Sequence, residues 1–157
     1  MELLGKPAVS LRLFVAGKMS LVICVFSPFA YAYCPCWFWQ GADGPARILA
    51  WIIYGLSGLV VLVASLELGE SLRVGLPSGK TRLKTTGLYS ISRNPIYASC
   101  YPWFLSAGVL APHPVIWALS LLSLYVHHRI ILGEEAFLKK RFGSEWKAYC
   151  SQVPRYV

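Results

Sequence analysis

Long apolar stretches alternate with short polar ones along this chain, and the pattern predicts an all-α integral membrane protein. A first apolar stretch covers residues 11–33, and the most uniform one has nineteen consecutive uncharged residues at 48–66. A membrane-spanning helix needs about 20 such residues. Two shorter stretches, 96–111 and 115–132, complete a predicted set of about four transmembrane helices.

The last two stretches are separated only by Pro112, His113 and Pro114, which predict a tight turn and therefore a C-terminal helical hairpin. From Glu134 onward, the spacing of the residues places aromatic side chains on one face of a helix and basic side chains on the other. This predicts an amphipathic C-terminal helix at the cytoplasmic membrane surface, broken near Gly143. The polar stretch at 74–95 is too polar for lipid and long for a connection, which favours a functional loop.

Charge changes this picture by suggesting an orientation. The chain has a net charge of +8, and fourteen of its fifteen Lys and Arg residues fall in the N-terminal stretch, in 73–93 or after Tyr125. Under the positive-inside rule, both termini are then cytoplasmic and the 34–47 loop lies on the other side. We expect no nucleic-acid partner, because these charges are spread between apolar runs. Lys18, inside the first stretch, is expected to reach up to the interface.

The length of 157 residues favours a single domain, with transmembrane helices in 1–72 and a catalytic core in 73–157. The five cysteines are scattered without the spacing of a zinc or redox site. The neighbouring histidines 127 and 128 point apart on a helix. We therefore expect no metal.

The first group of candidate residues lies in the motif LKTTGLYSISRNPIY at 83–97. Arg93 can bind a carboxylate or phosphate through two hydrogen bonds, Pro95 suits the first turn of a helix, and Gly87 permits close backbone approach. Alternatively, Arg93 only marks the cytoplasmic side, and Tyr89 and Tyr97 belong to an aromatic belt.

The second group comprises His127, His128 and Arg129, followed by Glu134 and Glu135. On a continuous helix each histidine shares a face with the glutamate seven residues later. Successive residues diverge by about 100°, so we expect only one carboxylate to face an internal site. Its partner would be Arg93 or a bound cation such as a sulfonium, although ordinary interfacial ion pairs would also explain the charges.

The motif at 83–97, the hairpin, and the stretch EEAFLKKRFGSEWKAYCSQVPRY together resemble the isoprenylcysteine carboxyl methyltransferase and phospholipid methyltransferase superfamily. The resemblance covers 83–156, about half of the chain, whereas the first 70 residues match only in being apolar. Arg93-Asn94-Pro95 stands where eukaryotic members usually have Arg-His-Pro, a variant similar to small bacterial members.

The resemblance implies a methyltransferase that uses S-adenosyl-L-methionine. In that superfamily a cytoplasmic loop and the carboxylate after the hairpin enclose the cofactor, while an acceptor with a lipid tail enters from the bilayer. The resemblance implies that the segment 81–84 contacts the cofactor. The individual residues that it implies as cofactor-binding are Leu83, Lys84, Gly87, Tyr89, Asn94, Pro95, Tyr97 and Glu134. Arg93 and Arg129 would orient the acceptor or the cofactor carboxylate.

The acceptor class stays open at this point between carboxyl O-methylation and phospholipid N-methylation. An amine acceptor would need a base such as Glu135 or His128. The bacterial likeness implies an inner-membrane location.

Two other functions compete with methyl transfer. Distant relatives with a similar core are NADPH-dependent sterol or enone reductases, but those proteins carry many more spans than this chain can hold. Alternatively, the loop and tail bind lipid headgroups without catalysis.

Overall fold

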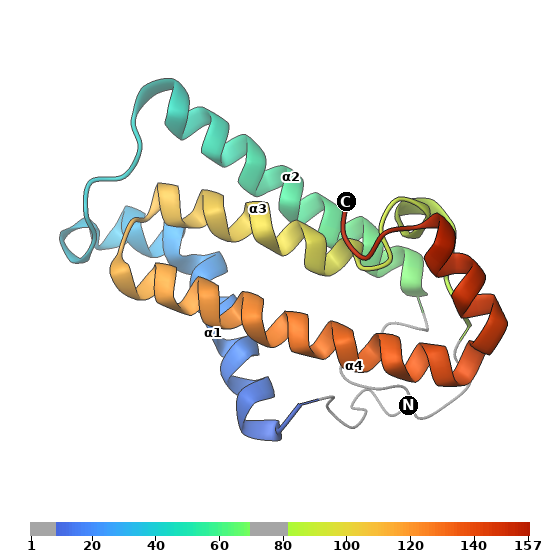
Figure 1. Cartoon of the computed structure of the whole chain (residues 1–157). Coiled ribbons are helices and arrows are strands. Elements are labelled where there is room, and N and C mark those ends of the chain that lie inside the picture. The colour runs from blue at the N-terminus through green and yellow to red at the C-terminus, as the bar shows by residue number, and fades with distance from the viewer. Residues whose placement is uncertain (1–8, 70–81) are drawn as a thin grey trace.

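The computed structural model describes residues 9–69 and 82–157, and within them every regular element is helical. The elements are α1 (Leu11–Tyr33), η1 (Pro35–Trp37), α2 (Gly44–Leu68), η3 (Gly87–Ser90), α3 (Pro95–Leu110) and α4 (Pro114–Gln152) (Figure 1). Among these, α1, α2 and α4 are long and apolar enough to cross a membrane, whereas α3 has 16 residues. The prediction of an all-α membrane protein is confirmed.

α3 and the start of α4 lie within one residue of the predicted positions, but α4 is longer than expected. The sequence suggested that the span ends at Leu132 and that a separate amphipathic helix follows, whereas the first helical segment of α4 continues past Gly133 to Phe142, and a second segment follows the kink at Gly143 and ends at Gln152. A single glycine at 133 weakens a helix by only about 1 kcal/mol, too little to end it. The break near Gly143 is confirmed: this residue has φ +49° and ψ −111°.

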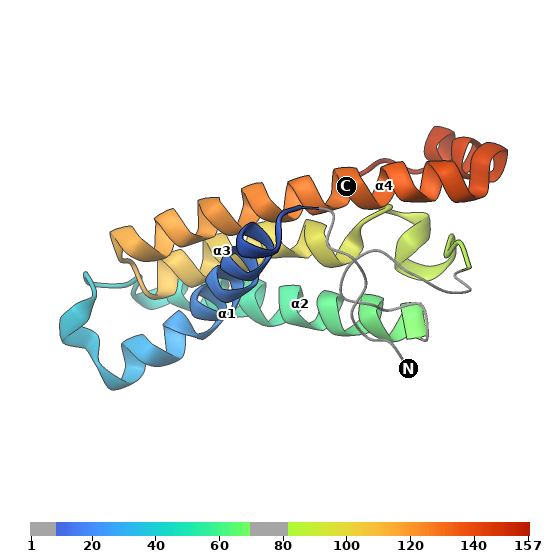
Figure 2. The ribbon, with the colours of Figure 1, turned by 90° about the horizontal axis from the view of Figure 1, so that it is seen from below.

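α3 lies between α2 and α4, and α1 crosses on the side of α3 and α4 (Figures 1 and 2). α1 packs mainly on α4, where Gly17 lies directly against Val126 and accepts a hydrogen bond from Ser123 at 3.2 Å. Close approach through small residues is typical of helices packed within a membrane.

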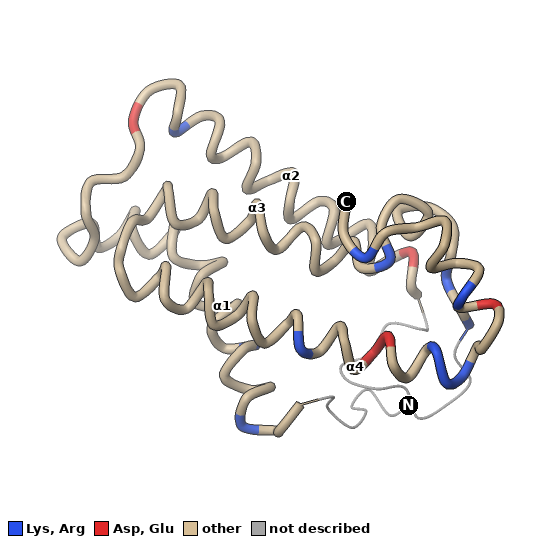
Figure 3. Tube along the Cα trace, in the orientation of Figure 1, with Lys and Arg blue, Asp and Glu red and all other residues tan. Residues whose placement is uncertain are grey.

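Two loops meet at one end of the bundle. The backbone N–H of Trp39 donates to the carbonyl of Pro112 at 3.0 Å, and that of Ala42 donates to Val109 at 3.2 Å. The 34–43 loop and the hairpin turn therefore lie on the same side, as the predicted topology requires. Most of the charged residues described lie toward the other end, where α2 ends, α3 begins and α4 ends (Figure 3).

The apolar side of the last helical segment packs on the protein itself. Trp146, Tyr149 and Val153 are buried and form a cluster with Leu83, Leu138, Phe142 and Cys150. We expected this side to rest on the membrane surface. Instead, the turn at Gly143 redirects the chain so that residues 144–152 cover the loop before α3 (Figure 1).

Candidate functional site

The loop before α3 is fixed to the end of α2 by Glu67. The carboxylate of Glu67 accepts a hydrogen bond from the backbone N–H of Leu88 at 2.9 Å. Gly87 adopts φ +68°, and a side chain there would collide with this carboxylate. The positive φ therefore favours glycine at 87, and a side chain there would push the Glu67 carboxylate away from the loop.

Tyr89 anchors the same loop from inside. Its side chain is buried, its hydroxyl donates to the carbonyl of Ala64 at 3.5 Å, and its own carbonyl accepts from the Tyr149 hydroxyl at 2.5 Å. Burial raises the pKa of Tyr89, and the nearby Glu67 carboxylate raises it further, so the hydroxyl stays neutral. Tyr89 thus joins α2, the loop and the last helical segment.

The segment after α4, residues 153–157, holds the start of α3. The carbonyl of Pro154 accepts from the backbone N–H of Arg93 at 2.9 Å. The carbonyl of Arg155 accepts from the Ser92 hydroxyl and from the Asn94 side-chain amide, both at 3.3 Å. Asn94 precedes the first turn of α3, so this segment fixes where the helix begins.

Arg93, Glu135 and Arg155 form one cluster of charges. Arg155 binds Oε2 of Glu135 through two hydrogen bonds of 2.7 and 3.0 Å. Arg93 lies 3.6 Å from Oε1, which is close enough for an ion pair but too long for a hydrogen bond. The Arg93 guanidinium also contacts the sulfur of Cys150 and lies 5.6 Å from the centre of the Trp146 ring. The expected partnership of Arg93 with a carboxylate therefore forms with Glu135.

Tyr97, Glu134 and Lys18 form a second cluster on another side of α4. The Tyr97 hydroxyl donates to Oε1 of Glu134 at 3.3 Å. Lys18, from α1, places its ammonium 5.8 Å from the centre of the Tyr97 ring and interacts with the charge of Glu134 at longer range. Lys18 was expected to extend to the interface, and its ammonium lies toward an aromatic face and a carboxylate, both of which attract its charge.

His127 borders this second cluster. Its ring centre lies 5.5 Å from that of Tyr97, and its side chain is 3% exposed. Nδ1 lies 2.7 Å from the carbonyl of Ser123, a geometry that assigns the proton to Nδ1. Nε2 is then an acceptor, and it is buried without a hydrogen-bond partner among the described residues. Such a group needs a ligand or water.

Both carboxylates lie near the edge of the membrane. Glu134 follows Pro114, the first residue of α4, by 20 positions. At 1.5 Å per residue this places it about 30 Å along the helix, which is the thickness of a hydrocarbon core. We expected only one of the two glutamates to face the protein. Both do, because different elements cover the two sides of α4.

The remaining predicted site residues are spread around these clusters. Leu83 packs against the apolar cluster under the last helical segment. Lys84, the next residue in the chain, is half-buried. Pro95 is buried at the first turn of α3. Arg129 is exposed, and its described hydrogen-bond partner is Tyr125, one turn earlier on α4, at 3.4 Å. Thr81 lies outside the described residues.

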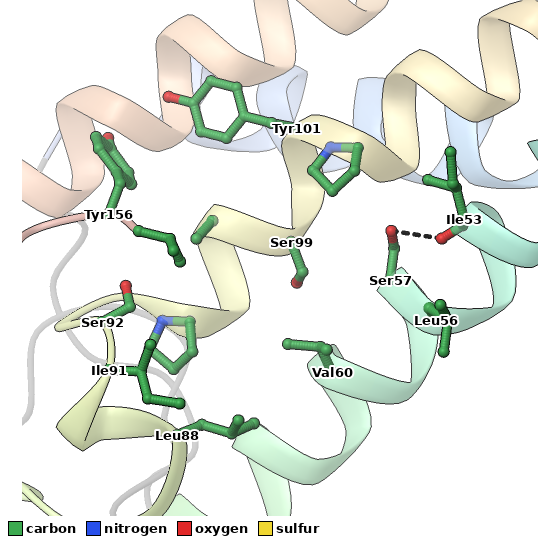
Figure 4. Close-up of a pocket in the computed structure, with 14 residues that line it drawn as sticks. Ile53, Leu56, Ser57, Val60, Leu88, Ile91, Ser92, Ser99, Tyr101 and Tyr156 are labelled. Carbon is green, nitrogen blue, oxygen red and sulfur yellow. Dashed lines mark hydrogen bonds between the residues drawn. The ribbon is translucent and has the colours of Figure 1, made fainter.

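A large apolar groove opens between α2 and α3 beside this site (Figure 4). Its volume is about 770 Å³. α2 contributes Ile53, Leu56, Ser57 and Val60, and the loop and α3 contribute most of the opposite wall. Tyr156 and Val157 also line it, and Figure 4 shows Tyr156 near the start of α3, the end of the bundle where most charged residues lie; we refer to this end of the groove as its charged end. A groove of this size and lining can hold a hydrocarbon tail.

The model of the phospholipid methyltransferase family matches residues 45–145. This chain belongs to the phospholipid methyltransferase family. No curated protein and no solved structure matches it.

The extent of the family match corrects one expectation from the sequence. We expected the first 70 residues to match nothing, but the match begins at residue 45 and so includes nearly all of α2. This helix carries one wall of the groove and, at Glu67, the support of the loop. α2 is thus part of the phospholipid methyltransferase unit.

Sequence reasoning missed four residues that shape the site: Lys18, Glu67, Arg155 and Tyr156. Lys18, Arg155 and Tyr156 lie outside the stretch matched by the phospholipid methyltransferase model. A lysine inside an apolar helix was a usable signal, because charge at that depth is rarely without a partner. Glu67 gave no comparable signal, because an acidic residue at the end of a span is ordinary.

No group of three or more His, Cys, Asp or Glu residues in 9–69 and 82–157 is arranged to hold a metal ion.

Proposed function

We propose that this member of the phospholipid methyltransferase family transfers a methyl group from S-adenosyl-L-methionine to the polar head of a lipid-like acceptor at the cytoplasmic membrane face. The observation that carries the proposal is the position of the Tyr97–Glu134 pair. It lies about 30 Å along α4, at the same end of α3 as the charged end of an apolar groove. Polar head and apolar tail would thus be accommodated side by side.

The chemistry requires alignment more than it requires a protein nucleophile. The cofactor supplies an electrophilic methyl group on a sulfonium, and transfer breaks the S–C bond while an O–C or N–C bond forms on the acceptor. Holding two reactants in line supplies roughly 7–11 kcal/mol of the barrier. Residues that position and enclose are therefore sufficient for catalysis.

Glu134 is the best candidate to hold the cofactor. Its one described hydrogen bond, from Tyr97, is long at 3.3 Å, so the carboxylate can still accept from an amino or ribose group. The unpartnered Nε2 of His127 next to Tyr97 also fits a site completed by a ligand. Asn94 and Lys84 would contribute from the loop side.

The other predicted cofactor residues would act by shaping the site. Gly87 and Tyr89 fix the loop on α2, Leu83 anchors it under the last helical segment, and Pro95 starts α3. These contacts would set the distance between the loop and Tyr97. Their substitution would therefore alter the enclosure of the cofactor without removing a direct contact.

Arg93 and Glu135 would serve the acceptor. Oε1 of Glu135 and Nε of Arg93 are buried without a hydrogen-bond partner among the described residues. They offer one acceptor and one donor beside the groove's charged end. A carboxylate acceptor needs no base, whereas an amine acceptor would give its proton to Glu135 or to His128. Arg129, on the exposed side of α4, would attract an anionic head.

The first test is calorimetric titration of S-adenosylhomocysteine into the detergent-purified protein. Wild type should bind saturably, and Glu134→Gln should weaken binding. Glu145→Gln is the matched control, because Glu145 is exposed and the chemical change is identical. Arg93→Ala should also reduce binding, because it removes the guanidinium that links the start of α3 to Glu135 and Trp146.

Failure to bind by a folded wild-type protein would contradict the proposal. Oxidation of NADPH in the presence of an enone would then support a reductase. Retained lipid binding with neither cofactor would support a lipid-binding protein without catalysis.

A further inference from the structure

Lys18 and Glu134 place a cation and a carboxylate in one cluster without a direct bond between them. Among the described residues, Lys18 makes no ion pair within 4 Å, and Glu134 accepts one long hydrogen bond, from Tyr97. The side chains of Lys18, Tyr97 and Glu134 are half-buried rather than closed off. Both charges therefore keep the capacity to bind a ligand that reaches them.

The same cluster is short of hydrogen-bond donors beside Tyr97. Nε2 of His127 is a buried acceptor without a partner among the described residues, and the His127 ring centre lies 5.5 Å from that of Tyr97. The carboxylate of Glu134 has a second oxygen that can also accept. A ligand that completes the cluster must bring donors for these acceptors and an anion for Lys18.

A zwitterion meets both requirements. The amino-acid group is the simplest example, because one carbon carries an ammonium with three donors and a carboxylate that accepts. Each of its charges would form a charge-assisted hydrogen bond with the opposite charge on the protein. A simple cation would leave Lys18 without a partner and would be repelled by it, and a simple anion would be repelled by Glu134.

The cluster and the apolar groove lie on different sides of α3. The groove is lined on the side of α3 that faces α2 by Pro95, Ala98, Ser99 and Pro102 (Figure 4). Tyr97, in contrast, contacts Lys18 of α1 and Glu134 of α4. A lipid tail in the groove therefore leaves the space beside Lys18 free for the other substrate.

We propose that Lys18 and Glu134 bind the amino-acid end of S-adenosyl-L-methionine, with Lys18 on its carboxylate and Glu134 on its ammonium. The ammonium also supplies the donor that Nε2 of His127 lacks. The inference rests on the proposed function and deepens it, because it assigns the orientation of the cofactor. It also gives α1 a role in binding, although Lys18 lies outside the stretch matched by the family model.

The test compares three ligands by calorimetric titration into the detergent-purified protein. S-adenosylhomocysteine carries both charges of the amino-acid group, its decarboxylated analogue keeps the ammonium alone, and 5′-methylthioadenosine has neither. Lys18→Met should weaken binding of S-adenosylhomocysteine about fivefold, which corresponds to one ion pair of about 1 kcal/mol. It should not weaken binding of the other two ligands.

Glu134→Gln should give a different pattern, because its partner is the ammonium. Binding of S-adenosylhomocysteine and of the decarboxylated analogue should weaken by roughly tenfold or more, and binding of 5′-methylthioadenosine should not change. The two variants together therefore assign each charge of the ligand to one residue.

Two further variants make the result specific. Lys18→Arg keeps the charge and should keep the preference for S-adenosylhomocysteine over its decarboxylated analogue. Lys139→Met is the matched control for Lys18→Met, because Lys139 is exposed and the chemical change is identical. Melting temperatures of all variants are measured in parallel. If Glu134→Gln does not fold, Lys18→Met and Lys18→Arg carry the test.

Equal losses for all three ligands in Lys18→Met, or no loss for any of them, would overturn the assignment of Lys18. Weaker binding of 5′-methylthioadenosine in Glu134→Gln would place this carboxylate on the ribose instead of the ammonium. In both cases S-adenosylhomocysteine still binds wild type, and the proposed function stands. Failure of folded wild type to bind S-adenosylhomocysteine would instead reject the proposed function itself, so the two failures are distinguishable.

Discussion

Glu134 and Glu135 are neighbours on one helix, yet their surroundings differ. Glu135 is held by two guanidinium groups, with two hydrogen bonds from Arg155 and a looser ion pair with Arg93. Glu134 has one long hydrogen bond from Tyr97 and the more distant charge of Lys18. Because successive residues on a helix diverge by about 100°, one carboxylate faces the 153–157 segment and the other faces α1 and α3.

The comparison separates two uses of a buried acid. A carboxylate bound by two arginines fastens elements together, and here it joins α4, the start of α3 and the 153–157 segment. Glu134 has a long hydrogen bond from Tyr97 and, among the described residues, no ion pair within 4 Å, so a ligand can still compensate its charge, whereas the charge of Glu135 is already compensated by two arginines. The pair therefore predicts that fold stability depends mainly on Glu135 and that cofactor affinity depends mainly on Glu134.

The largest expected effect is on affinity in Glu134→Gln. Loss of a charged hydrogen-bond acceptor costs about 1.5–3 kcal/mol, or roughly 10- to 150-fold in the dissociation constant for S-adenosylhomocysteine. The melting temperature of the purified protein should change little. Calorimetry and a thermal-shift assay measure the two quantities.

Glu135→Gln should show the opposite pattern. Removing the shared partner of Arg93 and Arg155 should lower stability by about 1–2 kcal/mol, a small figure because the Arg155 side chain is 37% exposed. The melting temperature should fall by roughly 5 °C. Equal losses of affinity and of stability in the two variants would show that the carboxylates act as one unit.

A smaller effect is expected in Lys18→Met. This change keeps the apolar stem but removes the cation beside Tyr97 and Glu134, and should weaken S-adenosylhomocysteine binding about threefold to tenfold, in line with a cation–π contact of about 1 kcal/mol. Arg12→Gln is the control, because Arg12 is exposed on the same helix. Equal affinity in wild type and Lys18→Met would remove α1 from the site.

The smallest effect is expected in Arg129→Ala. Arg129 is exposed and contacts Tyr125 rather than either carboxylate. Cofactor affinity should be unchanged, and turnover with an anionic acceptor should fall by no more than about fivefold, which corresponds to the attraction of one surface charge of about 1 kcal/mol. Steady-state kinetics at low and high salt would measure it, because screening should abolish the difference. A loss that persists at high salt would place Arg129 in direct contact with the acceptor.

Much of the fold could be predicted from the sequence because membrane helices are specified locally. Apolar stretches of the right length give the spans, and Pro112 to Pro114 give the hairpin turn. The continuation of α4 past Leu132 was not predictable in the same way. It depends on whether protein or membrane covers the apolar face that carries Phe142 and Trp146. Here protein covers it, through a cluster that includes Leu83, which is distant in sequence.

The site was only partly predictable for a related reason. The motif at 83–97 and the two glutamates identified the correct region, and the Arg93 partnership with a carboxylate follows from opposite charge. Which glutamate pairs with Arg93 depends on the rotation of α4 about its axis and on the position of residues 153–157 against the start of α3. Neither of these produces a periodic pattern in the sequence. Lys18 lies 116 positions before Glu134 in the chain. Only the packing of α1 on α4 brings them together.

The short length of α3 has a consequence for the surrounding bilayer. Its 16 residues measure about 24 Å, roughly 6 Å less than a typical hydrocarbon core. Tyr101 and Leu105 are exposed on this helix, so lipids pack against it directly. Local thinning of the bilayer is one way in which such a hydrophobic mismatch is relieved. Thinning beside α3 would bring headgroups toward Asn94 and shorten the distance that a lipid must travel out of its own monolayer to reach the groove.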